Sequence, residues 1–361
     1  MRAANFNGGP GALPLEVLEE AARDMMDWKG TGMSIMENSH RSKEVVAMVD
    51  ETIADLRALL GLDDDWAVIF CQGGASLQFA MIAMNFAGPG GHCDYINTGL
   101  WATKAYKEAQ ICGAKPRLAA SSEDDDFTHI PDVFDFDPEA KYIYLTTNNT
   151  VRGTQWQNYP QNAPAPLVAD MSSEFLSRPV VDLEHFGFIY AGAQKNVGPA
   201  GVTVVAVRRD FADKARLDVP SMLSYPIYIK NDSMYNTPPV WGIYISGLTF
   251  KWLRHTIGGL ENMAAINKAK ADALYNAIDS SKGYYRGTAR PCSRSSMNVT
   301  FRLPSEELDK KFKKEAQKEG LVGLGGHRSV GGLRASLYNA VGQDSVDKLV
   351  EFMAEFQRRN G

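Results

Sequence analysis

Cysteine is scarce in this sequence, and its few copies are scattered. Cys71, Cys93, Cys112 and Cys292 are the four cysteines among 361 residues, and no two of them form a CxxC pair. Disulfide frameworks and structural zinc sites need clustered cysteines, so this pattern indicates reduced thiols in a cytosolic protein. The six histidines include no HxxxH spacing, and we therefore expect no metal site.

Long apolar runs are absent as well. The first residues, MRAANFNGGPGALP, lack the apolar core of a signal peptide, and no run reaches the roughly 18 apolar residues of a membrane span. There is no internal repeat and no excess of basic residues, because the formal net charge is −5. These absences argue against a membrane-bound, repetitive or nucleic-acid-binding protein and favour a cytoplasmic location.

The sequence does have apolar material for a large core, since 44% of its residues are hydrophobic and 22% are charged. Its length predicts two domains. Strands are expected at 66–71, 141–147, 166–172, 186–192 and 202–207, and helices at 15–29, 42–60, 76–86 and 101–113. This alternation predicts an α/β fold with a mostly parallel sheet.

One connection departs from the parallel pattern. Only about nine residues join the segments 186–192 and 202–207, whereas a parallel crossover needs a dozen or more. We therefore expect these two strands to run antiparallel.

A smaller unit follows a helical region near 239–256. It is expected to contain a strand at 296–303, a helix at 305–319, a strand at 332–338, and a final helix capped by Ser345, with Val346, Leu349, Val350, Met353 and Phe356 on one face. We place the boundary at Gly258-Gly259. The expected parts are an N-terminal segment, 1–15, that packs against either unit, a large domain, 16–257, and a smaller α/β domain, 258–361.

Lys195 stands in an unusual setting for a lysine. It lies in FIYAGAQKNVGPAG (188–201), after a buried strand and among small residues that let a flat ligand approach. Ligands of α/β sheets bind beyond strand ends, and burial there makes a lysine amine a better nucleophile. Such lysines form Schiff bases with carbonyl compounds, and the ordinary alternative is a lysine that points into solvent.

Asp170 ends the apolar segment PLVADMS, and two interpretations are open. It caps a following helix, or it is a buried charge with a cationic partner. The second interpretation gains a chemical purpose if Lys195 binds pyridoxal phosphate, because a carboxylate then keeps the pyridine nitrogen protonated. The two residues together are a more specific signal than either alone.

A glycine pair precedes a third candidate site in CQGGASLQF (71–79). The strand ends, Gly73 and Gly74 turn the chain, and a helix begins near Ala75 and Ser76. Free N–H groups at a helix N-terminus bind phosphate, although two glycines before a helix are often only a turn. Beside Lys195, this segment is a candidate for a cofactor phosphate.

Two segments, NSHRS (38–42) and GGHRSVGGLRAS (325–336), place histidine next to arginine. Together, His40, Arg41, His327, Arg328 and Arg334 suit a substrate that carries a phosphate and a carboxylate. Taken singly, each His-Arg pair is more typical of a charged surface.

Two further features fit a flat, anionic ligand. Trp101 follows a strand-to-helix junction, where its indole stacks on a flat ring or packs in the core. Asn236 and Thr237 precede two prolines in MYNTPPV. In one interpretation they form a polar arm that reaches a ligand across a subunit boundary. In the other, Thr237 caps the next helix.

Five longer motifs occur along nearly the whole chain. They are SHRSKE, YAGAQKNVGPAG, MYNTPP, SGLTFKWL and GHRSVGGLRAS. With them, the sequence closely resembles the phosphoserine aminotransferase family, class-V aminotransferases that use pyridoxal 5′-phosphate and have the aspartate-aminotransferase fold, fold type I.

This resemblance implies a role for each candidate. Lys195 would form the Schiff base with the cofactor. The other cofactor-binding residues would be Ala75, Ser76, Trp101, Thr150, Asp170 and Gln194, with Asn236 and Thr237 from the second subunit of a homodimer. The substrate-binding residues would be His40, Arg41, His327, Arg328 and Arg334. The implied reaction is the reversible transfer of an amino group between phosphoserine and 2-oxoglutarate, which gives phosphohydroxypyruvate and glutamate in serine biosynthesis.

Two positions depart from the family pattern. Many members have serines where this chain has Asn7-Gly8, so backbone groups or Asn7 would contact the substrate carboxylate in place of a hydroxyl. Some members have Gly-Arg in place of Ala75-Ser76, so the phosphate would depend on Ser76 and N–H groups. Neither change affects Lys195.

Two other classes remain as alternatives. An alanine- or serine-glyoxylate aminotransferase, or a cysteine desulfurase, would share Lys195 and Asp170 but would not need two His-Arg pairs. A nucleotide-phosphate binder would need a GxxxxGK[ST] or GxGxxG motif, and GLGGHRSVGG (323–332) matches neither.

Overall fold

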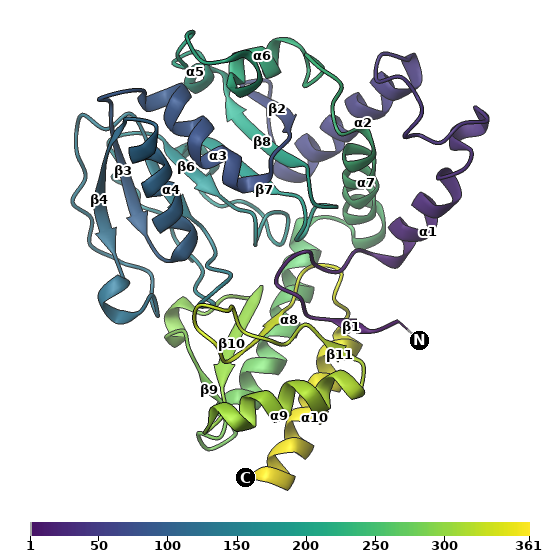
Figure 1. The fold of residues 1–361 in the computed structure, drawn as a ribbon, viewed down its shortest axis with the longest axis vertical. Coiled ribbons are helices and arrows are strands. Elements are labelled where there is room, and N and C mark those ends of the chain that lie inside the picture. Colours follow the sequence, from purple (N-terminus) through teal and green to yellow (C-terminus); the bar gives the residue numbers. More distant parts are fainter. Residues whose placement is uncertain (1) are drawn as a thin grey trace.

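Seven strands lie side by side in the upper part of Figure 1, in a computed structural model that describes residues 2–361. All neighbours run parallel except β8, which is antiparallel to both β2 and β7. The predicted parallel sheet with one antiparallel strand is therefore confirmed. In spatial order the strands are β2 (Trp66–Cys71), β8 (Thr203–Arg208), β7 (Phe186–Gly192), β6 (Leu167–Asp170), β5 (Ile143–Thr146), β3 (His92–Asn97) and β4 (Lys115–Ser121).

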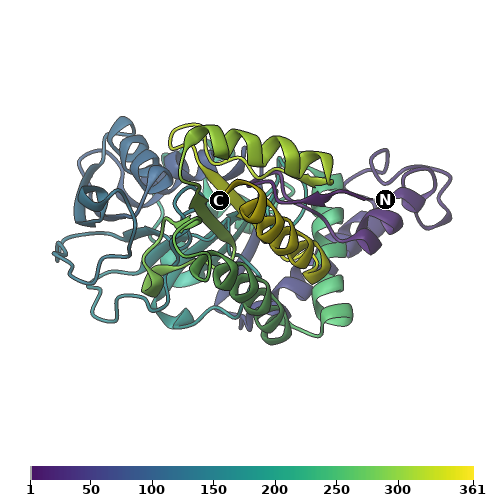
Figure 2. The same ribbon diagram turned by 90° about the horizontal axis from the view of Figure 1, so that it is seen from below.

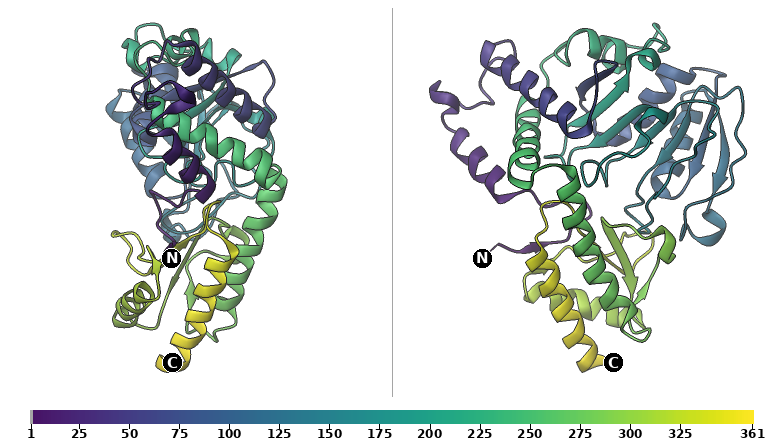
Figure 3. Two further views of the ribbon diagram at one scale, coloured as in Figure 1. Left: turned by 90° about the vertical axis from the view of Figure 1, so that its right-hand side faces the viewer. Right: turned by 180° about the vertical axis from the view of Figure 1, so that it is seen from behind.

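Helices cover both faces of this sheet (Figure 3). Because successive side chains of a strand point to opposite faces, Val68 and Phe70 of β2 join one apolar core while Ala67 and Ile69 join the other. The first core includes residues of α1 (Leu15–Asp24), α2 (Lys43–Leu60) and α7 (Val240–Lys251). The second includes residues of α3 (Gly74–Ile82), α4 (Leu100–Ile111), α5 (Arg209–Ala212) and α6 (Tyr225–Lys230).

A separate apolar core fills the lower part, which Figure 2 shows from below. Its antiparallel sheet has the order β12 (Leu333–Ser336), β10 (Asn298–Arg302) and β9 (Arg286–Gly287). The helices around it are α8 (Leu260–Asp279), α9 (Glu306–Lys318) and α10 (Gln343–Asn360). The N-terminal segment lies against this part, because β1 (Ala4–Asn5) pairs in parallel with β11 (Leu321–Val322).

Helix α8 connects the two parts (Figure 1). It follows Gly258, whose left-handed φ of 84° ends the preceding helical segment. Leu260 and Met263 pack in the upper core, whereas Leu274 and Ile278 pack in the lower one. The division into 1–15, 16–257 and 258–361 stays a prediction.

The start of the last helix differs from its prediction. Helix α10 begins at Gln343 after Gly342, so Ser345 lies inside the first turn and does not cap it. The apolar face was predicted correctly, since Val346, Leu349 and Met353 are buried. No helix within residues 2–361 combines the length and the apolar character that crossing a membrane requires.

Candidate active site

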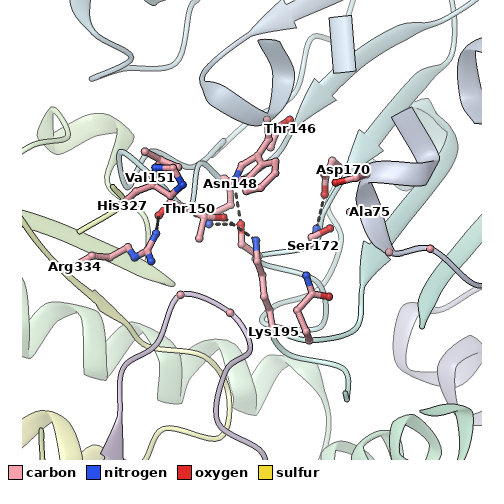
Figure 4. A pocket seen from close by; sticks show the side chains of 18 residues that line it. Ala75, Thr146, Asn148, Thr150, Val151, Asp170, Ser172, Lys195, His327 and Arg334 are labelled. Atoms are coloured by element: carbon pink, nitrogen blue, oxygen red, sulfur yellow. Dashed lines mark hydrogen bonds between the residues drawn. The ribbon is translucent and has the colours of Figure 1, made fainter. Parts of the chain in front are cut away.

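A cavity of about 350 Å³ opens where the upper and lower parts meet (Figure 4). It lies beyond the carboxyl ends of β5, β6 and β7, where α/β sheets place their ligands. The predicted residues that line it are Ala75, Ser76, Trp101, Thr150, Asp170, Gln194, Lys195, His327 and Arg334. The other lining residues are Gly8, Gly9, Gly73, Gly74, Thr146, Asn148, Val151, Ser172 and Ser173.

Lys195 enters this cavity from the loop after β7, and its side chain is surrounded by protein. Only 8% of the residue is exposed, and its Nζ donates a hydrogen bond to Thr150 Oγ1 over 2.8 Å. Burial lowers the pKa of Lys195 to about 8, against the opposing influence of the Asp170 carboxylate. A substantial share of its amine is therefore neutral near physiological pH, as a nucleophile requires.

Asp170 stands at the end of β6, and 5% of it is exposed. Its Oδ1 accepts the N–H of Ser172 over 2.9 Å, which orients the carboxylate (Figure 4). No helix begins in the segment that directly follows it, so the helix-cap interpretation is wrong. The burial of Asp170 agrees with the other interpretation, and the pairing of its carboxylate with a cation stays a prediction.

The first turn of α3 forms another wall of the cavity. Gly73 and Gly74 have φ angles of 87° and 67°, which glycine adopts more readily than other residues. No side chain caps this helix, so the amide groups near Ala75 and Ser76 are available to an anion. The local structure thus suits a phosphate.

Arg334 reaches the cavity from β12 with an uncompensated charge. Within residues 2–361 no carboxylate forms an ion pair with it, and its Nη1 donates to the Thr150 carbonyl over 2.9 Å. Its Nε is buried without a partner in the described chain, and burial lowers the pKa of the guanidinium. A half-buried arginine without a counter-charge suits a ligand carboxylate.

His327 and Trp101 complete the lining. His327 Nδ1 lies 2.7 Å from Ser329 Oγ, and burial together with the charge of Arg334 lowers the pKa of the imidazole. Trp101 Nε1 is buried without a hydrogen-bond partner among the described residues. Lys104 Nζ lies 4.8 Å from the centre of the Trp101 ring.

Other predicted residues do not line this cavity within one chain. They are His40, Arg41, Arg328, Asn236 and Thr237. All but the half-buried His40 are exposed, on turns and loops. The Thr237 carbonyl accepts a bond from Gln72 Nε2, and α7 begins after Pro239 without a side-chain cap, so the Thr237-cap interpretation is wrong. Their part in the site stays a prediction.

Several polar lining residues were missed by the sequence analysis. Thr146 is the last residue of β5 and Asn148 follows that strand, and Ser172 and Ser173 follow β6. Ser172 Oγ accepts the N–H of Gly192 over 3.0 Å, which ties the two strand ends together. The available signal was their place directly after buried strands, in TTNN and DMSS.

These residues fit pyridoxal phosphate. Lys195 offers an amine, Asp170 a carboxylate, Trp101 a flat ring, and the first turn of α3 a phosphate site. The orphaned Trp101 Nε1 and Thr146 Oγ1 leave polar atoms for a ligand to satisfy.

The comparisons with known proteins identify the family. A model described as aminotransferase class-V matches residues 3–349. The chain belongs to this family. The phosphoserine aminotransferase of Desulfosudis oleivorans is 54% identical to this class-V aminotransferase over 100% of the chain and 99% of that protein.

Solved structures agree with this assignment. Phosphoserine aminotransferase from Bacillus circulans subsp. alkalophilus has a TM-score of 0.97 and 51% identity, covering 100% of this chain and 99% of its own. The enzyme from Trichomonas vaginalis, described as bound to pyridoxal phosphate, has a TM-score of 0.93 and 40% identity, covering 98% and 100%. They confirm the predicted fold type I for this class-V aminotransferase.

Proposed function

We propose that this class-V aminotransferase uses pyridoxal 5′-phosphate to transfer an amino group between O-phospho-L-serine and 2-oxoglutarate. The products are 3-phosphohydroxypyruvate and L-glutamate, and the reaction is a step of serine biosynthesis. The observation that carries the proposal is the buried Lys195 beside Asp170, opposite an arginine without a carboxylate partner in the described chain. The names of relatives at about half identity support the choice of substrate.

The cofactor, when bound, supplies an aldehyde that captures amines and a ring that accepts electrons. Lys195 would hold it covalently, and Asp170 would keep its ring nitrogen protonated. Thr150 lies within hydrogen-bond distance of Lys195 Nζ and would hold the ring hydroxyl near that amine. Trp101 would contact the ring, and Ala75, Ser76 and Gln194 would hold the phosphate. Asn236 and Thr237 of a partner subunit would complete the phosphate site.

Lys195 also moves the proton in this proposal. With its Nζ free of the cofactor, Lys195 would take the proton from the substrate α-carbon, hold it on Nζ and give it up again within the cavity. Its pKa of about 8 suits both steps, because the group is neither permanently charged nor permanently neutral. Thr150 keeps the released Nζ close to the cavity.

Arg334 binds the α-carboxylate shared by both amino acids. His327 and Arg328, with His40 and Arg41 of a partner subunit, bind the distal anion. Phosphate and side-chain carboxylate are both anions that Arg and His grip, so one site serves phosphoserine and glutamate.

A homodimer that shares its sites is part of this proposal. His40 and Arg41 end a segment whose Met26, Met33 and Met36 are 80%, 42% and 54% exposed. Exposed apolar side chains of this size favour coverage by another protein surface. The second subunit would bring the polar loops to the cavity. We propose a cytoplasmic location for the dimer.

The test is the visible absorption of the purified protein before and after addition of O-phosphoserine without a keto acid. We expect a yellow protein that bleaches with phosphoserine and far less with alanine or serine. A Lys195→Ala variant is the control, and it should not bleach. A yellow protein that ignores phosphoserine but bleaches with alanine or serine would move the function to a glyoxylate-type aminotransferase. A colourless protein that stays so with added cofactor would contradict the role of Lys195.

A further inference from the structure

Asn339 lies just after β12 and joins three parts of the molecule. Its backbone N–H donates to Asn196 Oδ1 over 3.0 Å, beside Lys195. Its Nδ2 donates to the Leu176 carbonyl over 2.8 Å. Its Oδ1 accepts from Asn267 Nδ2 of α8 over 2.9 Å. The loop after Asp170, the loop of Lys195 and helix α8 thus meet at one residue.

All of these groups are withdrawn from water. Asn339 is 5% exposed, Asn196 4%, Asn267 1% and Leu176 1%. Leu176 has a φ of 60°, a left-handed conformation that leucine rarely adopts and that surrounding contacts must maintain. Asn339 supplies one such contact through its bond to the Leu176 carbonyl. Asn267 supplies another, because its Nδ2 donates to the Ser177 carbonyl over 2.9 Å.

Lys270 holds the turn that carries Asn339. It lies one helical turn from Asn267 on α8 and is fully buried. Its Nζ donates to the carbonyls of Leu337, Tyr338 and Val341 over 2.9 to 3.1 Å. These carbonyls lie on both sides of Asn339 in the chain, so the lysine ties the turn that carries Asn339 to α8.

We propose that Asn339 is a positioning residue for the amino-transfer reaction. By binding the loops of Lys195 and Asp170 to one point, it sets the place of the amine relative to the carboxylate. The same turn follows β12, so it also relates both groups to Arg334. The proposal rests on the proposed function only in naming the reaction, because the contacts belong to the chain itself.

A matched control separates positioning from plain stabilisation. Asn85 is also fully buried, and its Nδ2 donates to the Met81 and Leu223 carbonyls while its Oδ1 accepts the Tyr225 N–H. It does not line the cavity. Asn339→Ala removes two buried side-chain bonds, to the Leu176 carbonyl and from Asn267, and keeps the backbone N–H bond to Asn196. Asn85→Ala removes three buried side-chain bonds away from the cavity.

The test compares the two variants as holoenzymes with O-phosphoserine. We expect Asn339→Ala to lower kcat by about 10- to 100-fold, since small misplacements of reacting groups are costly, and to shift the pH midpoint of the cofactor's visible absorption. Asn85→Ala should show a similar fall in Tm, with kcat and midpoint close to those of the wild type. Equal effects of both variants on kcat and midpoint would overturn the proposal.

Hydrogen exchange of the cofactor-free protein tests the same point without activity. We expect faster exchange at 171–177 in Asn339→Ala and at 193–198 in Asn196→Ala, which removes the acceptor beside Lys195. Unchanged exchange at both segments would overturn the proposal. If Asn339→Ala does not fold, Asn196→Ala carries the kinetic test with the same expected loss. A wild type inactive with phosphoserine would contradict the proposed function while leaving the exchange result decisive for Asn339.

Discussion

At the scale of single residues, the surroundings of Lys195 decide the chemistry. Desolvation disfavours its ammonium, while Asp170 opposes the shift and Arg334 reinforces it. The amine donates a hydrogen bond to Thr150 Oγ1, and it forms no ion pair among the described residues. The group is thereby held at a pKa of about 8, where it both attacks a carbonyl and carries a proton.

This pKa leads to a first prediction about pH. The rate at which the cofactor-free protein takes up pyridoxal phosphate should rise with pH and level off above about 8, because only the neutral amine reacts. Stopped-flow absorption between pH 6 and 10 measures the rate, and Lys195→Arg serves as the control without covalent uptake. A rate that still rises steeply toward pH 10 would show that Lys195 titrates like an exposed lysine.

A second prediction concerns Gly8. A Cβ added there would lie 2.1 Å from Arg334 Nη2, so Gly8→Ala should displace the guanidinium that is proposed to bind the α-carboxylate. We expect the KM for phosphoserine to rise about tenfold, the scale of one charge-assisted hydrogen bond. Gly287→Ala is the control, because its Cβ would meet no atom closer than 3.7 Å. Equal KM values for the two variants would contradict the role of Arg334.

Sequence reasoning found the residues that lie in recognisable local motifs and missed those whose role depends on contacts distant in the sequence. Lys195 and Asp170 stand at the ends of apolar strands, so their meeting followed from the sheet. The contact between Gly8 and Arg334 joins opposite ends of the chain, and no local pattern encodes it. Thr150 was expected only from the family resemblance, although it bonds directly to Lys195.

At the scale of elements, the length of a connection was a better guide to structure than the preference of a side chain. The short connection between β7 and β8 predicted their antiparallel pairing, which is confirmed. The cap of α10 was wrong because Gly342, in extended conformation, already ends the preceding turn. The preference of a side chain for the cap position is a weaker signal than the length of a connection, because both glycine and serine are compatible with a helix start.

Helix α8 carries a third prediction, on stability. Burial lowers the pKa of Lys270 to about 7, whereas an unfolded lysine titrates near 10.4. Between these values the unfolded chain binds more protons, so Lys270 adds stability as pH rises. The free energy of unfolding of the wild type relative to Lys270→Met should grow by about 2 kcal/mol in total from pH 7 to 9, with a slope that approaches about 1.4 kcal/mol per pH unit above pH 8.

Urea unfolding at pH 7, 8 and 9 measures this difference. Lys268→Met is the control on the same helix, because it removes a lysine whose side chain is 74% exposed instead of buried. A constant difference between wild type and Lys270→Met across this range would show that Lys270 keeps its proton in the folded state. The three carbonyls around Nζ would then outweigh its burial.

At the scale of the whole molecule, one chain brings together only part of the predicted site. The cavity contains the groups that suit the cofactor and Arg334. The half-buried His40 and the exposed Arg41, Asn236 and Thr237 do not line it. Sequence reasoning named most residues of both groups from local motifs, but the spacing of one chain does not show which residues a second subunit would contribute. Its test must therefore be made on the assembly.

A shared site predicts that two inactive variants restore each other. In a mixture of Lys195→Ala and Arg41→Ala subunits, each mixed dimer would hold one site with an intact Lys195 and an intact Arg41 from the other subunit. Random exchange makes about half of the dimers mixed, so activity should recover to about a quarter of the wild-type value. Each variant exchanged with itself is the control and should stay inactive. If Arg41 serves the cavity of its own chain instead, every site in the mixture lacks one of the two residues, and exchange will restore nothing.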